Sequence, residues 1–259
     1  MTDRQPTGDD ILRVWNAMAG TWDSHMETGR TWQRRLIAPA VERLLCLQSG
    51  ERVLDIACGN GEFARRMATL GARVLATDFS EGMLERARAH GGQVDYRLAD
   101  ATDRDQLLGL GTEGPFDACV CNMAIMDISD LAPMASAARE LLRAGGRLVF
   151  STLHPAFNSS AVTRMVEQFD DENGVRRVHS IKVSRYIRPQ VGLGVALEGQ
   201  PETQWYFDRP ISAILGVFFR SGFVLDGVEE PVFDRADVTP GSPSAVFAEI
   251  PPVFVARLR

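Results

Sequence analysis

Short apolar runs alternate with helical runs from about residue 52 to residue 150, and this alternation constrains the fold more than any other feature. Several apolar runs are continuous, which is typical of parallel strands that helices cover on both faces. A repeated strand–helix–strand order predicts an α/β fold with a doubly wound parallel sheet and right-handed crossovers. We expect strands at residues 53–57, 74–77, 94–98, 118–122 and 147–153, and helices at 62–70, 81–89 and 133–143.

Two regions fall outside this alternation. Residues 11–47 have a helical pattern and are rich in tryptophan, which predicts a helical N-terminal lid. Residues 155–209 hold a polar turn, an alternating stretch and a glycine-rich stretch, which predict a β-rich cap inserted before a helix at 211–221. Strands at 223–228 and 253–258 would complete a single domain over residues 1–259.

Charge and cysteine spacing argue against several classes of function. The chain has a formal net charge of −6 and no dense run of lysine and arginine, so no nucleic-acid partner is expected. No apolar run has the length that spans a bilayer or the form of a signal peptide, which predicts a cytoplasmic protein without a membrane partner. The four cysteines lack the spacing of a zinc site or a disulfide framework, and we expect no metal.

The most informative motif follows the first predicted strand. Gly59 and Gly61 begin the pattern G-x-G-x-x-A at a strand-to-helix turn. Glycines suit such a turn because a ligand approaches the backbone closely there, and because glycine takes a positive φ without strain. The pattern alone is weak, since a purely structural turn also satisfies it.

Carboxylates at three successive strand ends strengthen this interpretation. Asp55 lies in the first strand, Asp78 ends the second and Asp100 follows the third. Asp78 can accept hydrogen bonds from two ribose hydroxyls, Asp100 can accept one from an adenine amino group, and Phe79 offers adenine an apolar face. The carboxyl ends of parallel strands meet at the crevice where open α/β sheets bind ligands, so these side chains are expected to face one site.

Five segments within about residues 50–153 resemble the class I S-adenosylmethionine-dependent methyltransferases of the small-molecule type. The segments are VLDIACGNGEFAR, VLATDFSEGMLERAR, RLADAT, FDACVCNMAIMDI and LLRAGGRLVF. The resemblance implies a Rossmann-like seven-stranded sheet with the last strand antiparallel, and S-adenosyl-L-methionine as the cofactor. It places Asp55, Gly59 and Gly61 beside the methionine and ribose, and Asp78 on the ribose hydroxyls.

The remaining cofactor contacts are also implied by the resemblance. Phe79 would pack on adenine, Asp100 with the backbone of Ala101 would contact its edge, and Asn122 would lie near the methionine amino group. Ala57, Met83 and Trp22 would complete the site. Trp22 stands where many relatives have tyrosine, and an indole cannot accept a hydrogen bond.

Two alternatives use the same glycine loop. A nicotinamide-dependent oxidoreductase explains Asp78 through its ribose but gives no reason for Asp55 or Asp100. A non-catalytic S-adenosylmethionine-binding protein differs only in its acceptor pocket.

The methyl acceptor is expected at the strand ends on the methionine side. His154, after the fifth strand, is the leading candidate for a general base because imidazole titrates near neutrality, and Asp127 is the second. Residues predicted to line the acceptor pocket are His25, Met123, Tyr186, Trp205 and Tyr206.

The residues predicted for the acceptor pocket favour a particular class of acceptor. An enclosure lined by aromatic rings suits a small organic molecule better than a polymer. Methyltransferases of nucleobase or glutamine amino groups often carry Asn-Pro-Pro-aromatic where this chain has Asn122 and Met123, which argues against that substrate class. We expect O-methylation with assistance from a base, with N- and C-methylation left open, in a monomer or homodimer.

Overall fold

The computed structural model describes residues 5–28, 32–172, 174–188, 191–239 and 242–259. Its helices are α1 Gly8–Thr28, a π-helical turn Trp32–Ile37, α2 Ala38–Leu45, α3 Glu62–Thr69, α4 Glu81–Ala89, α5 Arg104–Leu108, α6 Ala132–Leu141, α7 Ile211–Arg220 and short 3₁₀ turns at Gly109–Glu113, Arg235–Asp237 and Pro243–Ala248. Its strands are β1 Arg52–Ile56, β2 Arg73–Asp78, β3 Val94–Leu98, β4 Phe116–Asn122, β5 Leu142–Leu153, β6 Val162–Asp171, β7 Gly174–Val183, β8 Val191–Gly194, β9 Gln204–Phe207, β10 Leu225–Glu229 and β11 Val253–Leu258.

Seven of these strands form one sheet in the order β10-β11-β5-β4-β1-β2-β3. The pairs β4–β5, β1–β4, β1–β2 and β2–β3 are parallel, and β11 runs antiparallel to both β5 and β10. The chain order reverses direction between β1 and β4, which is where doubly wound sheets open a crevice for ligands. The predicted seven-stranded sheet with an antiparallel last strand is confirmed.

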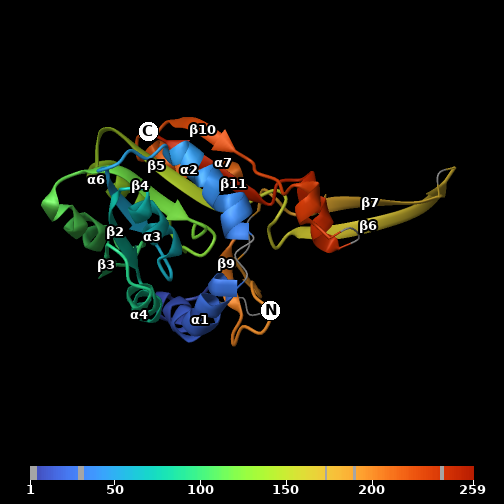
Figure 1. Ribbon diagram of the computed structural model, residues 1–259, viewed down its shortest axis with the longest axis horizontal. Helices are drawn as coiled ribbons and strands as arrows, with labels where there is room; N and C mark the ends of the chain where they lie inside the picture. The colour runs from blue at the N-terminus through green and yellow to red at the C-terminus, as the bar shows by residue number, and fades with distance from the viewer. Residues whose placement is uncertain (1–4, 29–31, 173, 189–190, 240–241) are drawn as a thin grey trace.

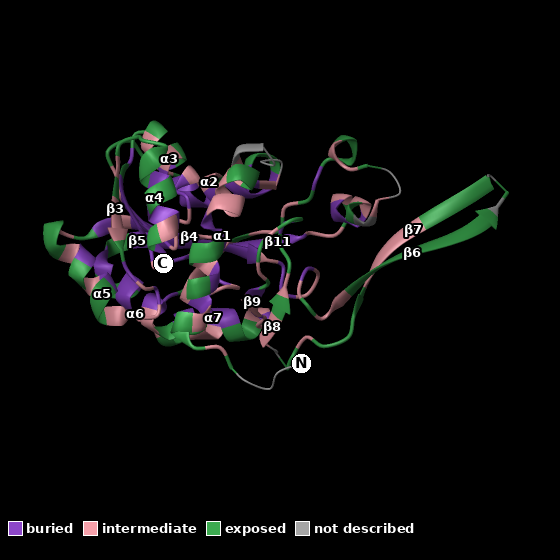
Figure 2. Cartoon of the chain, turned by 90° about the horizontal axis from the view of Figure 1, so that it is seen from below, coloured by how far each residue is buried: buried purple, intermediate pink, exposed green. Residues whose placement is uncertain are grey.

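Helices cover both faces of this sheet. Figure 2 shows α2, α3 and α4 on one side of the sheet and α5, α6 and α7 on the other. Within β1, Val53 packs into the core on the α2–α3 side and Leu54 into the core on the α6–α7 side. Continuous apolar runs are required because successive residues of a strand point to opposite faces, and here both faces are buried.

The N-terminal region is helical, as predicted. α1 lies beside α4 and also touches β9, while α2 packs on β5, β10 and β11. The helix α1 therefore spans from the sheet domain to the inserted segment, across the carboxyl-end edge of the sheet. No helix in the described part of the chain is long and apolar enough to cross a bilayer.

The insertion at 155–209 is β-rich, as predicted, but its two halves are placed differently. The β6–β7 hairpin projects away from the sheet domain (Figure 1), and the described residues at the outer ends of both strands are exposed (Figure 2). The shorter β8–β9 hairpin lies against α1. The predicted cap thus divides into a projecting arm and a small hairpin beside the sheet.

Candidate functional site

A cavity of about 980 Å³ lies at the carboxyl-end edge of the sheet. Residues at or just after the ends of β1, β2, β3, β4 and β5 line it on one side. Side chains from α1, from the π-helical turn and from β8–β9 close the other side. The strand ends that the sequence singles out therefore meet in one enclosed space.

The glycine loop after β1 borders this cavity. Gly59 (φ 56°) and Gly61 (φ 72°) both adopt the left-handed backbone conformation that favours glycine. A Cβ on Gly59 would meet nothing within 4 Å, whereas a Cβ on Gly61 would lie 2.4 Å from the hydroxyl of Tyr96. Gly59 lines the cavity and Gly61 does not, so the second glycine serves packing and the first leaves space for a ligand.

Asp78 is fixed in place by the loops on either side of it. Its Oδ2 accepts a hydrogen bond from the backbone N–H of Gly59 (2.9 Å), and its Oδ1 accepts one from the N–H of Ser80 (2.9 Å). Burial raises the pKa of Asp78 to about 6, and these N–H groups partly oppose that rise. The carboxylate is pre-oriented at the cavity wall with lone pairs left for a ligand's hydroxyl groups.

Asp55 is the most unusual carboxylate in the site. It is 1% exposed, and neither of its oxygens has a hydrogen-bond partner among the described residues. Burial, followed by the nearby charge of Asp78, raises its pKa to about 8. Buried carboxylates are normally paired, so this arrangement indicates that a cationic or donor group of a ligand completes the site.

The loops after β2 and β3, with α4, contribute the residues that would surround adenine. The Oδ1 atom of Asp100 accepts hydrogen bonds from the backbone N–H and the hydroxyl of Thr102, at 2.7 and 2.8 Å, which fixes the carboxylate at the rim. Phe79, Met83 and Ala101 line the same part of the cavity. This pocket has an apolar wall beside a hydrogen-bond acceptor, as a purine ring requires.

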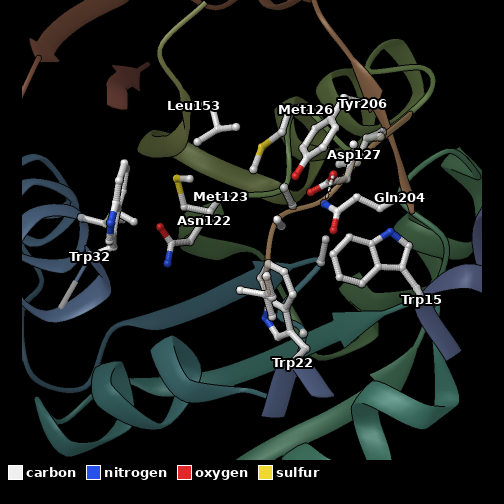
Figure 3. A pocket seen from close by; sticks show the side chains of 18 of the residues that line it. Trp15, Trp22, Trp32, Asn122, Met123, Met126, Asp127, Leu153, Gln204 and Tyr206 are labelled. Carbon is white, nitrogen blue, oxygen red and sulfur yellow. Dashed lines mark hydrogen bonds between the residues drawn. The ribbon is translucent and has the colours of Figure 1, made fainter. Parts of the chain in front are cut away.

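The end of β4 presents hydrogen-bond donors to the cavity. The Oδ1 of Asn122 accepts a hydrogen bond from the hydroxyl of Ser151 (2.6 Å), which leaves the side-chain NH₂ turned into the cavity (Figure 3). An NH₂ group suits a carboxylate better than the predicted ammonium group. Ala57 (φ 58°) and Met123 (φ 57°) follow β1 and β4 in the left-handed region, which is strained for non-glycine residues and recurs at ligand sites.

Helix α1 closes the cavity through two tryptophans. The rings of Trp15 and Trp22 pack edge to face with centroids 5.4 Å apart, and both line the cavity (Figure 3). Trp22, predicted for the cofactor site, lines the cavity, and its ring contributes an apolar wall. His25, in the last turn of α1, also lines the cavity although it is exposed.

Polar side chains fasten α1 to the ligand loops. The Oδ1 of Asp23 accepts a hydrogen bond from Asn60 Nδ2 (2.8 Å) in the glycine loop and lies 2.7 Å from His90 Nε2 at the end of α4. Two turns away on α1, the Oδ1 of Asn16 accepts a hydrogen bond from the hydroxyl of Ser80 (2.6 Å). These contacts hold the lid helix directly against the loops after β1 and β2.

A polar cluster lies across the cavity from Asn122 (Figure 3). Gln204 Nε2 donates a hydrogen bond to Asp127 Oδ1 (3.3 Å), and the ring of Tyr206 stands beside the pair. Asp127 faces the cavity but lies deep among protein atoms, and this burial raises its pKa well above the usual range. Burial also raises the pKa of the Tyr206 hydroxyl.

Besides Gly61, three residues predicted for the acceptor side of the site lie outside the cavity wall. His154 is 1% exposed, its Nε2 lies 2.8 Å from Glu230 Oε1, and its Nδ1 accepts a hydrogen bond from the N–H of Ala156 (3.2 Å). Both ring nitrogens are therefore engaged, and this placement does not support a role as general base. The hydroxyl of Tyr186 accepts from the N–H of Ile211, away from the cavity. Trp205, predicted with Tyr206 for the acceptor pocket, also lies off its wall.

Strand alternation explains two of these placements. Leu153 lines the cavity, so His154, the next residue, points to the opposite face. Gln204 and Tyr206 line it two residues apart in β9, which turns Trp205 away. Sequence reasoning did not predict that Trp32, Gln33, Met126, Leu153 and Gln204 line the cavity. The alternation in β9 was the signal that could have added Gln204 to Tyr206.

Comparison with known proteins agrees with this geometry. A family model described as a methyltransferase domain matches residues 53–146. A ubiquinone biosynthesis O-methyltransferase of Xanthomonas oryzae is 38% identical over 110 residues, covering 41% of this chain but only 44% of the relative. One of Aromatoleum aromaticum is 31% identical over 173 residues, covering 61% of this chain and 72% of the relative. The chain thus spans less than half the length of some curated relatives that it matches.

A solved structure extends the likeness beyond the matched segment. An S-adenosylmethionine-dependent methyltransferase from Mesorhizobium loti has 27% sequence identity and a TM-score of 0.64, covering 90% of this chain and 99% of that one. The chain belongs to the class I S-adenosylmethionine-dependent methyltransferases. The nicotinamide-dependent alternative is therefore wrong as a family assignment.

The residues present fit the cofactor of this family. The two unpartnered oxygens of Asp55 suit a positively charged ligand, and the open space at Gly59 admits a close approach to the backbone. Asp78 and Asp100 offer acceptors to the ribose hydroxyls and the adenine amino group. Each feature belongs to this chain's own geometry and is independent of the similarity to relatives.

Proposed function

We propose that this chain catalyses the S-adenosylmethionine-dependent O-methylation of a small organic acceptor. The observation that carries the proposal is that one cavity contains both the cofactor residues at Asp55 and Asp78 and the polar cluster at Asp127. The names of the Xanthomonas and Aromatoleum relatives support oxygen as the accepting atom. A cavity of about 980 Å³ is in the range that encloses small molecules.

The chain's residues would hold the cofactor along the strand ends. We place Asp78 on the ribose hydroxyls, Phe79 and Asp100 on adenine, and Asp55 with Asn122 beside the methionine part. When bound, S-adenosylmethionine supplies a methyl group on a positively charged sulfur, which an acceptor oxygen can displace. Orientation contributes much of the rate in such a reaction, because a positioned acceptor removes the entropy of encounter.

Asp127 is the proposed general base. A carboxylate that faces the cavity can accept the proton of an acceptor hydroxyl, and a raised pKa makes it a stronger base than an exposed aspartate. The hydrogen bond from Gln204 holds one oxygen and orients the carboxyl group. Because the base form is the ionised one, we expect the turnover rate to rise with pH until Asp127 is fully deprotonated.

Helix α1 would keep water from the reacting groups. Trp15 and Trp22 cover the cavity, and the contacts of Asn16 and Asp23 fasten the helix to the cofactor loops. Excluding water strengthens the electrostatic interactions inside the site.

The proposal is tested first by calorimetric titration with S-adenosylhomocysteine, with NADH as the control ligand. Micromolar binding of S-adenosylhomocysteine without binding of NADH is expected, followed by methyl transfer in a screen of alcohols and phenols. Asp127→Asn should then bind S-adenosylhomocysteine within about twofold of the original chain while turnover falls roughly a hundredfold or more. Binding without transfer to any acceptor would instead indicate a non-catalytic binding protein.

A further inference from the structure

Gln204 carries a hydrogen-bond acceptor that the folded chain leaves unused. The residue is 1% exposed, lines the cavity, and comes from β9 of the inserted segment. Its Nε2 donates to Asp127 Oδ1, which fixes the orientation of the amide and leaves Oε1 on the other side. Oε1 is buried and has no hydrogen-bond partner among the described residues (Figure 3).

A buried amide oxygen without a partner is unusual. More than nine in ten buried polar groups in folded proteins have a hydrogen-bond partner, because a buried polar group without a partner destabilises the folded state. Asp55, elsewhere in this cavity, also has oxygens without a hydrogen-bond partner among the described residues, and the cofactor's charge explains these. Gln204 lies across the cavity from Asn122, beside Asp127, and its unused oxygen therefore points to the acceptor.

Local packing holds Gln204 and Tyr206 on the cavity face of β9. Gly194 of β8 pairs with Gln204, and a Cβ on Gly194 would lie 2.6 Å from the ring of Tyr206. The Tyr206 ring therefore lies across the space that a side chain at position 194 would fill. This close approach fixes the ring beside Asp127 and gives the subsite a rigid aromatic side.

The charges of the wall limit the acceptor further. Within the described part of the chain, the acidic side chains that line the cavity outnumber the single arginine, Arg164. The acidic residues are Asp55, Glu62, Asp78, Asp100, Asp127, Asp208 and Asp237. An anionic acceptor would find only Arg164 as a cationic partner among the lysine and arginine side chains of this described wall, whereas a neutral acceptor needs no such partner.

We infer that Gln204 is a specificity-determining residue that accepts a hydrogen bond from a second donor group of the acceptor, next to the hydroxyl that Asp127 deprotonates. The acceptor is a non-anionic molecule with two neighbouring hydrogen-bond donors on an apolar body that packs against Trp15, Trp22 and Tyr206. This inference rests on the proposed function, because it assigns the second donor relative to the reacting hydroxyl.

The test is a binding cycle with two probes and three proteins. Catechol has two neighbouring hydroxyls, and guaiacol has the same ring with one hydroxyl methylated. Their dissociation constants are measured by calorimetry on the protein saturated with S-adenosylhomocysteine, for the original chain, Gln204→Met and the matched control Gln33→Met. Gln33 is also a buried amide (8% exposed) that lines the cavity, on the side of the π-helical turn, so its replacement controls for the loss of any buried amide.

The original chain and Gln33→Met should bind catechol roughly tenfold or more tightly than guaiacol, and Gln204→Met should bind the two about equally. Gln204→Asn, which keeps the amide but shortens its reach, should lose the preference as well. An unchanged preference in both Gln204 variants, or no binding of catechol to the saturated original chain, would overturn the inference. Failure of S-adenosylhomocysteine to bind at all would instead contradict the proposed function, so the two failures are distinguishable.

Discussion

Replacing Asp55 by asparagine separates the contribution of this carboxylate to ligand binding from its effect on the stability of the ligand-free fold. Its pKa is about 8 in the folded chain and near 4 when exposed, so folding takes up one proton between these two values. Because the folded state holds the additional proton, the free energy of unfolding falls as pH rises through this window. Above about pH 8 and below about pH 4, the contribution of Asp55 to the free energy of unfolding does not change with pH.

The slope has a definite size. One additional proton held by the folded state changes the free energy of unfolding by about 1.4 kcal/mol per pH unit. Between about pH 5.5 and about pH 7.5 the ligand-free protein should therefore lose about 3 kcal/mol through Asp55. For a chain of this length that corresponds to roughly 5–10 °C in the melting temperature. Asp55→Asn cannot take up this proton. Over the same pH range, its melting temperature should therefore fall by roughly 5–10 °C less than that of the original chain.

Thermal unfolding of both proteins across this pH range measures the difference, without ligand. The same pair is then titrated with S-adenosylhomocysteine at neutral pH, where Asp55→Asn should bind about tenfold or more weakly because a charge-assisted contact is lost. Asp117→Asn is the control with the opposite sign. The N–H of Arg52 and the side chain of Arg143 lower the pKa of Asp117, so its contribution to stability is lost on acidification. Parallel melting curves for Asp55→Asn and the original chain, with equal affinities, would refute the reasoning.

Two further predictions concern positions that the structure assigns to packing. Gly61→Ala should lower the free energy of unfolding by about 2–4 kcal/mol, because it combines a positive φ with an overlap against Tyr96. Gly59→Ala should lower the free energy of unfolding by only about 1 kcal/mol, because its methyl group points into open space, yet it should weaken S-adenosylhomocysteine binding. Chemical denaturation measures the stability of both glycine variants, and calorimetry measures their affinity. Equal stabilities of the two variants would contradict the packing argument. His154→Ala should lower stability by about 2–3 kcal/mol, because a buried ring stacked on Phe157 is lost, while methyl transfer well below the melting temperature stays within a fewfold of the original rate. A hundredfold loss of turnover in that variant would restore His154 as the base.

The sheet could be predicted from the sequence because its strands are buried on both faces. β4 contains an uninterrupted apolar run at residues 118–121, and every predicted strand from residue 53 to residue 153 overlaps an observed one. The predicted helix at 133–143 extends two residues beyond α6, and β5 begins already at Leu142, five residues before the predicted strand. Glycines at 145 and 146 favour a break there, but the ladder with β4 continues through an irregularity in register.

The cofactor side of the site was predictable for a different reason. Asp55, Asp78 and Asp100 are local features of strand ends, and parallel strands bring their carboxyl ends together whatever the rest of the chain does. The residues that line the acceptor side depend on which face of β5 and of β9 points into the cavity. Residues 153 and 204 face the cavity, but the sequence of short strands near a boundary does not specify that face. The residue types in these segments suggested that His154 and Trp205 belong to the site. The sequence did not specify the direction in which either side chain points.

Several unfavourable groups of the ligand-free fold lie at one edge of the sheet. Among the described residues, the oxygens of Asp55 and the Oε1 of Gln204 lack hydrogen-bond partners, and Ala57 and Met123 hold strained backbone conformations at the ends of β1 and β4. The two apolar cores on either side of the sheet are continuous and supply the stability that tolerates these groups. Because each unpartnered atom faces the cavity, a ligand that satisfies them stabilises the fold in proportion to its binding free energy. Cofactor should therefore raise the melting temperature first, and a correct acceptor should raise it again, by less when Gln204 is replaced by methionine.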